Sequence, residues 1–139
     1  MDVGASEVVR RAIEAINDRS LRSRVDELLE PSIVRHDLVR LFPDSEGTGA
    51  GSDFVGMIAG AMPDFRLEID DIFGAGDRVA VRLTMRGTHT GAPLLGRQAT
   101  GRALSANAVF IYRVRHGRIA EAWQMVDGLA FFRLAGVLT

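Results

Sequence analysis

The sequence contains neither cysteine nor lysine, and each absence removes a class of chemistry. Without cysteine, the chain has no thiol nucleophile, no thiolate ligand for zinc and no disulfide. All 17 basic residues are arginine, so no lysine amine is present to form a Schiff base. With only three histidines and no cysteine, a transition-metal site has little support. We therefore expect a reaction without metal or cofactor, carried by carboxylate, amide, hydroxyl or imidazole groups and water.

The chain also lacks an excess of charge of either sign. Its 17 basic and 18 acidic residues give a net charge of −1, which provides no electrostatic surface for nucleic acid or an anionic membrane. No apolar run approaches the ~20 residues of a membrane span, and the first residues show no signal-peptide pattern. We therefore expect a cytoplasmic protein with no nucleic-acid or membrane partner.

The length and composition favour one globular domain over residues 1–139, since 47% of the residues are hydrophobic and no linker divides the chain. Apolar residues at helical spacing between Val9 and Ile16 predict a first helix. A second helix is predicted from Ser20 to the residue before Pro31. A third is predicted over residues 52–62, where proline follows.

From Phe65 onward, the apolar residues alternate as in strands that are half buried. The predicted strands, including one before this region, are 32–38, 66–73, 78–89, 103–114 and 119–126. GAGD and RHGR provide hairpin turns, and a short helix is predicted over 129–135. This order predicts an α+β fold in which N-terminal helices pack on a strongly curved antiparallel sheet and enclose a pocket.

Four short motifs follow one another in the second half of the chain: GDRV, RGTHTG, TGR and HGRIAEAW. In this order they resemble the SnoaL-like polyketide cyclase family of the NTF2-like superfamily. The resemblance extends from about Met62 to Gly136, and VRHDL in the first predicted strand also fits. It implies an NTF2-like cone with a buried pocket for a small, apolar, polyketide-like molecule. Because this fold supports many reactions, the resemblance does not by itself imply one.

The positions that carry the family's acid–base pair are changed in this chain. The aldol cyclases of the family use an aspartate on the last strand and a histidine on the strand beside it, and these positions align with Gln124 and Phe110. Hairpin geometry supports the alignment, because both residues are equidistant from a turn near Gly117 and face each other. Glutamine forms hydrogen bonds but does not shuttle a proton at neutral pH. We therefore expect Gln124 to stabilise charge in the pocket.

Two other residues are candidates for proton transfer. His36 ends the first predicted strand and titrates in a useful pH range, but a structural, hydrogen-bonded imidazole is equally open. Asp127 lies near the end of the last strand and is a candidate acid. It also directly precedes the last predicted helix, where aspartate is a favoured N-cap. We favour the cap, in which the carboxylate accepts a hydrogen bond from the N–H of Ala130 or Leu129.

Several other side chains are predicted to contact the substrate, and most of them would also suit a hydrophobic core. They are Phe110, Trp123, Met125, Phe54, Met62, Met85 and His89. His89 has a second possible role, because it lies where a strand enters a loop and a loop-fixing hydrogen bond suits that position. Trp123 has the strand parity opposite to Gln124, so it needs a bulge to reach the same pocket. The small residues Ala106, Ala108 and Ala122 share the face of Gln124 and leave volume for a ligand.

Three functions are compatible with these residues. The first is a cyclase or isomerase of polyketide or related natural-product tailoring, as in antibiotic biosynthesis, which holds the chain folded and stabilises charge. The second is epoxide opening by water or an internal hydroxyl, which needs both an acid and a base. The third is a non-catalytic ligand-binding or accessory protein, which the loss of the Asp/His pair favours. We expect the first.

A homodimer is also predicted from the strand pattern. Val109, Ile111 and Ile119 are expected on the outer face of the sheet, where they would be exposed in a monomer. Covering them with a second copy of the chain would remove this apolar surface from water.

Overall fold

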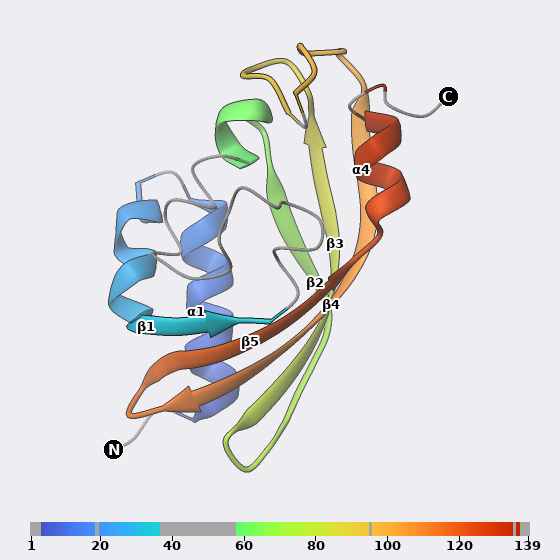
Figure 1. Ribbon diagram of the computed structural model, residues 1–139. Coiled ribbons are helices and arrows are strands. Elements are labelled where there is room, and N and C mark those ends of the chain that lie inside the picture. The colour runs from blue at the N-terminus through green and yellow to red at the C-terminus, as the bar shows by residue number, and fades with distance from the viewer. Residues whose placement is uncertain (1–3, 19, 37–57, 95, 135, 137–139) are drawn as a thin grey trace.

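The computed structural model describes residues 4–18, 20–36, 58–94, 96–134 and 136 (Figure 1). The helices and strands are α1 (Ala5–Asn17), the 3-10 helix η1 (Arg22–Leu28), β1 (Leu29–Arg35), β2 (Arg66–Ala75), β3 (Arg78–Thr88), β4 (Ala103–Arg115), β5 (Arg118–Val126) and α4 (Gly128–Leu134). One more helical turn covers residues 58–61. None of the helices in these described ranges is long and apolar enough to span a bilayer.

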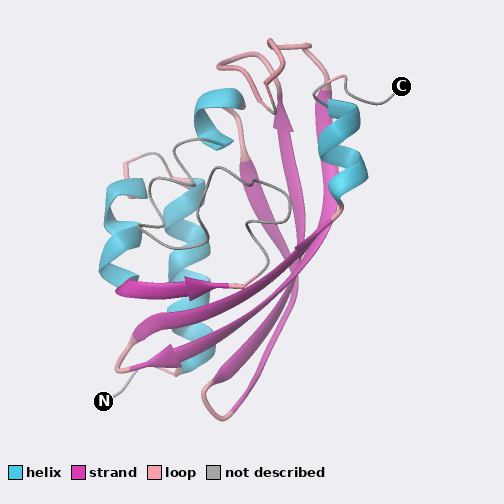
Figure 2. Ribbon diagram, viewed as in Figure 1, coloured by secondary structure: helices cyan, strands magenta, loops and turns pink. Residues whose placement is uncertain are grey.

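The five strands form one sheet in the order β1-β5-β4-β3-β2. The pairs β2–β3, β3–β4 and β4–β5 are antiparallel, whereas the pair β1–β5 is parallel. Figures 1 and 2 show that the sheet bends around α1 and η1, which lie on its concave side. The predicted α+β architecture is therefore confirmed, with the difference that the sheet is mixed, because the short first strand joins the edge beside β5 in the same direction.

Helix α1 is held on the sheet by an apolar face and by a polar clamp at its end. Val8, Val9, Ala12 and Ile13 are buried on one side of the helix, at the spacing of an amphipathic helix. At the last turn, the Asn17 side chain donates to the carbonyl of Leu67 and accepts from its N–H, both at 2.7 Å. This pair of hydrogen bonds fixes α1 against β2 and so sets the helix-side wall of the space above the sheet.

The hairpin of β4 and β5 contains a β-bulge near its turn. Arg113 pairs with Glu121 and Val114 pairs with Ile119, so Ala120 is an extra residue without an opposite partner. The extra residue changes the strand parity, and both Ile119 and Ala120 are buried. The prediction that Ile119 lies on the outer face is therefore wrong, because the alternation was counted without the bulge.

The N-terminal elements differ from their predicted bounds. The second helix is a 3-10 helix that ends at Leu28, and β1 starts at Leu29, so that Pro31 lies within a strand. Proline is tolerated there because β1 is at the edge of the sheet. The predicted third helix, over 52–62, lies largely outside the described residues, and its described part is the helical turn at 58–61.

Candidate functional site

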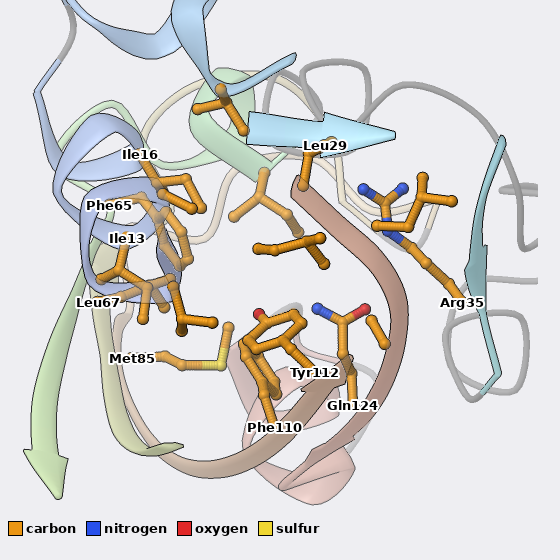
Figure 3. A pocket seen from close by; sticks show the side chains of 17 residues that line it. Ile13, Ile16, Leu29, Arg35, Phe65, Leu67, Met85, Phe110, Tyr112 and Gln124 are labelled. Carbon is orange, nitrogen blue, oxygen red and sulfur yellow. The ribbon is translucent and has the colours of Figure 1, made fainter. Parts of the chain in front are cut away.

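A cavity of about 70 Å³ lies between the helices and the concave face of the sheet. Its wall combines residues of α1, η1, β1, β2, β3, β4 and β5 with Ile58 and Phe65 (Figure 3). Among the lining residues that the structure describes, all side chains are apolar except Arg35, Tyr112 and Gln124. Whole drug-sized ligands occupy pockets of roughly 300–1,000 Å³. In this conformation the cavity therefore admits a small molecule, or one reactive end of a longer one.

Tyr112 and Gln124 form a hydrogen-bonded pair in this wall. Burial raises the pKa of the Tyr112 hydroxyl, and this outweighs the opposing effects of the Gln124 hydrogen bond and the positive charge of Arg35. The hydroxyl therefore stays protonated at neutral pH and is able to donate. Gln124 Oε1 is buried and has no hydrogen-bond partner within the described part of the chain. Since a buried acceptor without a donor is unfavourable, a ligand that donates to this atom would be stabilised.

The β-ladder explains why these groups meet. Gln124 pairs with Phe110, and Ala122 pairs with Tyr112, so all four side chains lie on the cavity side of the β4–β5 hairpin. Alternating residues of a strand share a face, and this hairpin keeps its register from Ala108 to Arg113. The structure thus places Gln124 and Phe110 opposite each other in the cavity wall, where the hairpin symmetry locates them.

Two polar lining residues, Arg35 and Tyr112, were not among the predicted site residues. Tyr112 could have been found, because it lies two residues after Phe110 on the same strand and must share its face. Arg35 could not be assigned a face with equal certainty, because the bounds of β1 were predicted three residues late. The observed strand places Leu29, Ile33 and Arg35 in the cavity wall.

His36 lies outside the cavity, on the outer face of the sheet. Its ring stacks on Trp123 with a centroid distance of 4.8 Å, and its Nε2 is 2.7 Å from Glu121 Oε2. The His36 side chain is 37% exposed. The placement of His36 in the pocket is therefore corrected, because it follows the inward-facing Arg35 and points to the opposite side of β1. The alternative of a structural imidazole agrees with these contacts.

Trp123 and Met125 also lie on the outer face. They pair with Ile111 and Val109, which are exposed, and Met125 itself is 61% exposed. The Arg78 guanidinium lies over the Trp123 ring, 5.2 Å from its centroid. The prediction that these two residues line the pocket is therefore wrong. A bulge beside Trp123 would have been needed to turn it inward, but the bulge of the β4–β5 ladder lies nearer the turn, so both side chains stay on the face opposite to Gln124.

The remaining predicted contact residues have separate positions. Met85 lines the cavity. Met62 is buried in the core and packs so closely on Gly87 that a Cβ atom at this glycine would be only 2.9 Å from the Met62 Sδ. Met62 does not line the cavity. His89 is fully buried in the loop after β3, and its Nε2 is 2.9 Å from the carbonyl of Ala92, a loop-fixing contact away from the cavity. Phe54 lies outside the described residues.

Asp127 lies between β5 and α4 and does not line the cavity. Its Oδ1 accepts a hydrogen bond from the backbone N–H of Ala130 at 3.3 Å. This is the N-cap contact, and it follows from an aspartate placed just before a helix. This contact is the one expected of the favoured cap, and the carboxylate is exposed beside α4, so the candidate role of Asp127 as an acid stays an untested alternative.

We expect Asp127→Ala to lower the free energy of unfolding by about 0.5–2 kcal/mol, because α4 loses its N-cap. Asp127→Asn should be nearly neutral for both stability and activity, because asparagine also caps helices. Urea denaturation and a turnover assay on the two variants check this. A stable but inactive Asn variant would contradict it and would give the carboxylate a role in proton transfer.

The described part of the cavity wall provides no acid–base pair of the usual kind. None of the lining residues in the described ranges is Asp, Glu or His. Among the same residues, no group of three His, Cys, Asp or Glu side chains lies close enough to hold a metal ion. The chemistry of the wall therefore rests on a phenol, an amide and a guanidinium, which donate hydrogen bonds and stabilise negative charge.

Comparison with known proteins identifies one family. The profile of the SnoaL-like polyketide cyclases matches residues 6–133. No curated protein sequence matches the chain. The match to the family profile covers most of the chain, including α1, the sheet and most of α4.

Three solved structures illustrate the similarity. IdmH, a proposed polyketide cyclase from Streptomyces antibioticus, is 29% identical, covers 96% of this chain and 99% of its own, and superposes with a TM-score of 0.77. AclR, a proposed hydroxylase from Streptomyces galilaeus, is 25% identical over 97% of this chain and 86% of its own, with a TM-score of 0.77. TsrD from Streptomyces laurentii is 23% identical over 99% of both chains, with a TM-score of 0.79. These similarities confirm the predicted NTF2-like fold.

Proposed function

Because this chain belongs to the SnoaL-like polyketide cyclase family, we propose that it is a cofactor-independent cyclase or isomerase that acts on a polyketide or a related natural product in the cavity. The observation that carries the proposal is the hydrogen-bonded pair of Tyr112 and Gln124 in an otherwise largely apolar wall. An apolar cavity excludes water, and fixed hydrogen-bond donors in it stabilise charge more strongly than water does. IdmH, a proposed polyketide cyclase, supports the same class of reaction.

The proposed mechanism replaces a proton-shuttling carboxylate by positioning and charge stabilisation. The apolar walls hold the substrate folded, so that its reacting carbons are close together. The Tyr112 hydroxyl donates to the substrate carbonyl oxygen on which negative charge develops as the enol carbon of the same substrate attacks that carbonyl, and the proton that the enol oxygen loses neutralises the alkoxide that forms. Gln124 orients the phenol by its own hydrogen bond. Ring closure of this kind suits substrates that already enolise readily, because the described residues of the wall supply no strong base.

The test is turnover. The purified chain is incubated with linear tri- and tetraketide acids and, separately, with their esters, and the cyclised products are followed by mass spectrometry and absorbance. We expect products beyond one equivalent of protein, and we expect Gln124→Ala to lower the rate while the circular dichroism spectrum stays unchanged. Rates equal to that of buffer for the wild-type chain with every substrate would count against an enzyme of this class.

A non-catalytic ligand-binding role is the second candidate, and one observation favours it. The described cavity wall has no carboxylate or imidazole, the groups that most often transfer protons in enzymes. In that case the same polyketides would bind stoichiometrically and would be recovered unchanged. The turnover assay, run with equilibrium dialysis on the same samples, separates the two functions.

We also propose that the protein forms a homodimer through the outer face of the sheet. This face carries apolar side chains that remain exposed in the single chain, at 45% for Val109, 38% for Ile111 and 61% for Met125. They lie on the adjacent strands β4 and β5 and so form one contiguous region. Contiguous apolar surface of this kind is typical of a protein–protein contact.

We expect multi-angle light scattering at micromolar concentration to give twice the mass of the chain. Val109→Glu should shift the protein to a monomer, because it places a charge in the centre of the proposed contact. Gln98→Glu, which adds the same charge in the exposed loop before β4, should leave the mass unchanged. A wild-type monomer, or equal masses for the wild type and Val109→Glu, would contradict the proposed contact.

A further inference from the structure

A polar niche lies in the cavity wall around Ala122. This residue of β5 pairs with Arg35 of β1 on one side and with Tyr112 of β4 on the other. The three residues form a row across adjacent strands, and all three line the cavity. Neighbouring strands are about 4.8 Å apart, so the backbones of Arg35 and Tyr112 are separated by roughly 10 Å. Ala122, between them in the row, contributes only a methyl group to the cavity wall.

Gln124 lies beside this niche, two residues further along β5 on the same face. Gln124 forms a hydrogen bond with Tyr112, which opposes the rise in the Tyr112 pKa that burial causes. Figure 3 shows the amide nitrogen on the side of Tyr112 and the amide oxygen on the other side. The phenolic proton is therefore directed to another acceptor, and the buried Gln124 Oε1 lacks a donor within the described residues.

The buried Gln124 Oε1 and the charge of Arg35 together indicate the kind of ligand that would bind here. A carboxylate would pair with Arg35, since charge-assisted hydrogen bonds to arginine favour carboxylates, and the Tyr112 hydroxyl is left to donate to the reacting carbonyl oxygen. A hydroxyl group on the same ligand would donate to Gln124 Oε1. An ester or a simple ketone offers neither a charge nor a donor, and it would leave Gln124 Oε1 buried without a partner.

Building on the proposed function, we propose that the substrate is a free carboxylic acid that also carries an enol or hydroxyl group, and that Arg35 selects this acid over its neutral derivatives. The carboxylate lies over Ala122 beside Arg35, and the hydroxyl hydrogen points to Gln124 Oε1. The apolar remainder of the molecule contacts the α1 side of the cavity. Arg35 thereby determines specificity, Gln124 contributes to binding, and Tyr112 acts in the reaction.

A binding experiment without turnover tests this assignment. The probes are 3-hydroxybenzoate, which carries both groups, its neutral isostere 3-hydroxybenzamide, and benzoate, which lacks the hydroxyl. NMR titration at pH 7 should show that the wild type binds 3-hydroxybenzoate about tenfold more tightly than the amide, as expected for a charge-assisted pair. Benzoate should bind more weakly than 3-hydroxybenzoate, and Gln124→Met should remove that difference.

Variants of Arg35 separate a specific pair from a general charge effect. Arg35→Gln should reduce the preference for the acid to less than about twofold, and Arg35→Lys should retain most of it. Arg118→Gln makes the same change in net charge at the exposed start of β5 and should keep the wild-type preference. If Arg35→Gln does not fold, as judged by circular dichroism, the wild-type and Arg35→Lys titrations carry the test.

Each outcome bears on the assignment. Equal binding of acid and amide by the wild type, binding of neither, or a preference that survives in folded Arg35→Gln would overturn it. The assignment would also be overturned if Arg118→Gln reduced the preference for the acid as much as Arg35→Gln does, because the preference would then reflect net charge. A preserved acid preference in a protein without turnover would instead reject the proposed cyclase activity and leave the acid-binding site standing.

Discussion

Replacing Tyr112 by phenylalanine should lower kcat for cyclisation by about 10²-fold, since the removal of one fixed donor to a developing oxyanion typically has an effect of this size. The substitution keeps the ring in the core and removes only the hydroxyl, whose raised pKa keeps it protonated and able to donate. KM should change much less than kcat, because the donor acts mainly on charge that appears in the transition state. Steady-state kinetics with a substrate that is turned over measures both constants.

The matched control is Trp123→Phe, which also changes a polar aromatic residue, but on the outer face of the sheet, where it contacts His36 and Arg78. It should leave kcat within about twofold of the wild-type value, because surface changes away from the cavity have small effects. Equal losses in both variants would indicate a general perturbation of the sheet. Full activity of Tyr112→Phe would exclude the phenol as the donor.

Phe110→Ala should lower the free energy of unfolding by about 3–5 kcal/mol, because a buried aromatic ring is removed and a larger cavity is left. Phe110 is only 5% exposed, and its ring meets that of Tyr112 edge to face at a centroid distance of 6.0 Å. Urea denaturation measures the loss. Leu129→Ala serves as a matched truncation at a position that is 52% exposed, and its effect should stay within about 0.5 kcal/mol.

The same substitution should widen the range of ligands. The cavity is small, and the Phe110 ring forms part of its wall beside Gln124. We expect Phe110→Ala to bind bulkier hydroxy acids than the wild type does, provided that it remains folded at the temperature of the assay. If Phe110→Ala lowered the free energy of unfolding by less than about 1 kcal/mol and bound no larger ligands than the wild type, the ring would not be packed as its burial indicates.

The sheet could largely be predicted from sequence because β3 and β4 alternate regularly and because short turns join β2 to β3 and β4 to β5. Phe110 and Gln124 were located from the family resemblance with the symmetry of the hairpin in support, and the ladder shows them paired. The same counting failed at Ile119, where the extra residue Ala120 reverses the parity over a distance too short for an alternation pattern to reveal. A bulge is a property of the pairing between two strands, and one strand's sequence does not display it.

The polar part of the site was less accessible to sequence reasoning. His36 attracted attention as a titratable residue, whereas its neighbour Arg35 is the one that reaches the cavity. Which of two adjacent residues faces inward depends on where the strand starts, and β1 follows a 3-10 helix whose end has no strong sequence signal. Tyr112 carried a usable signal in its parity with Phe110. Its hydrogen bond to Gln124, however, depends on side-chain geometry across two strands.

The bent sheet separates the chain's two distinctive chromophores. The single tryptophan, Trp123, lies on the outer face with His36, whereas the single tyrosine, Tyr112, lies in the cavity wall. Indole emission should therefore respond to what covers the convex side: if two chains associate there as proposed, we expect it to shift to the blue and to be shielded from iodide, and we expect filling the cavity to leave it largely unchanged. Tyrosine absorbance in the near ultraviolet responds to the opposite side. One unlabelled sample thus reports assembly and ligand occupancy at two separate wavelengths.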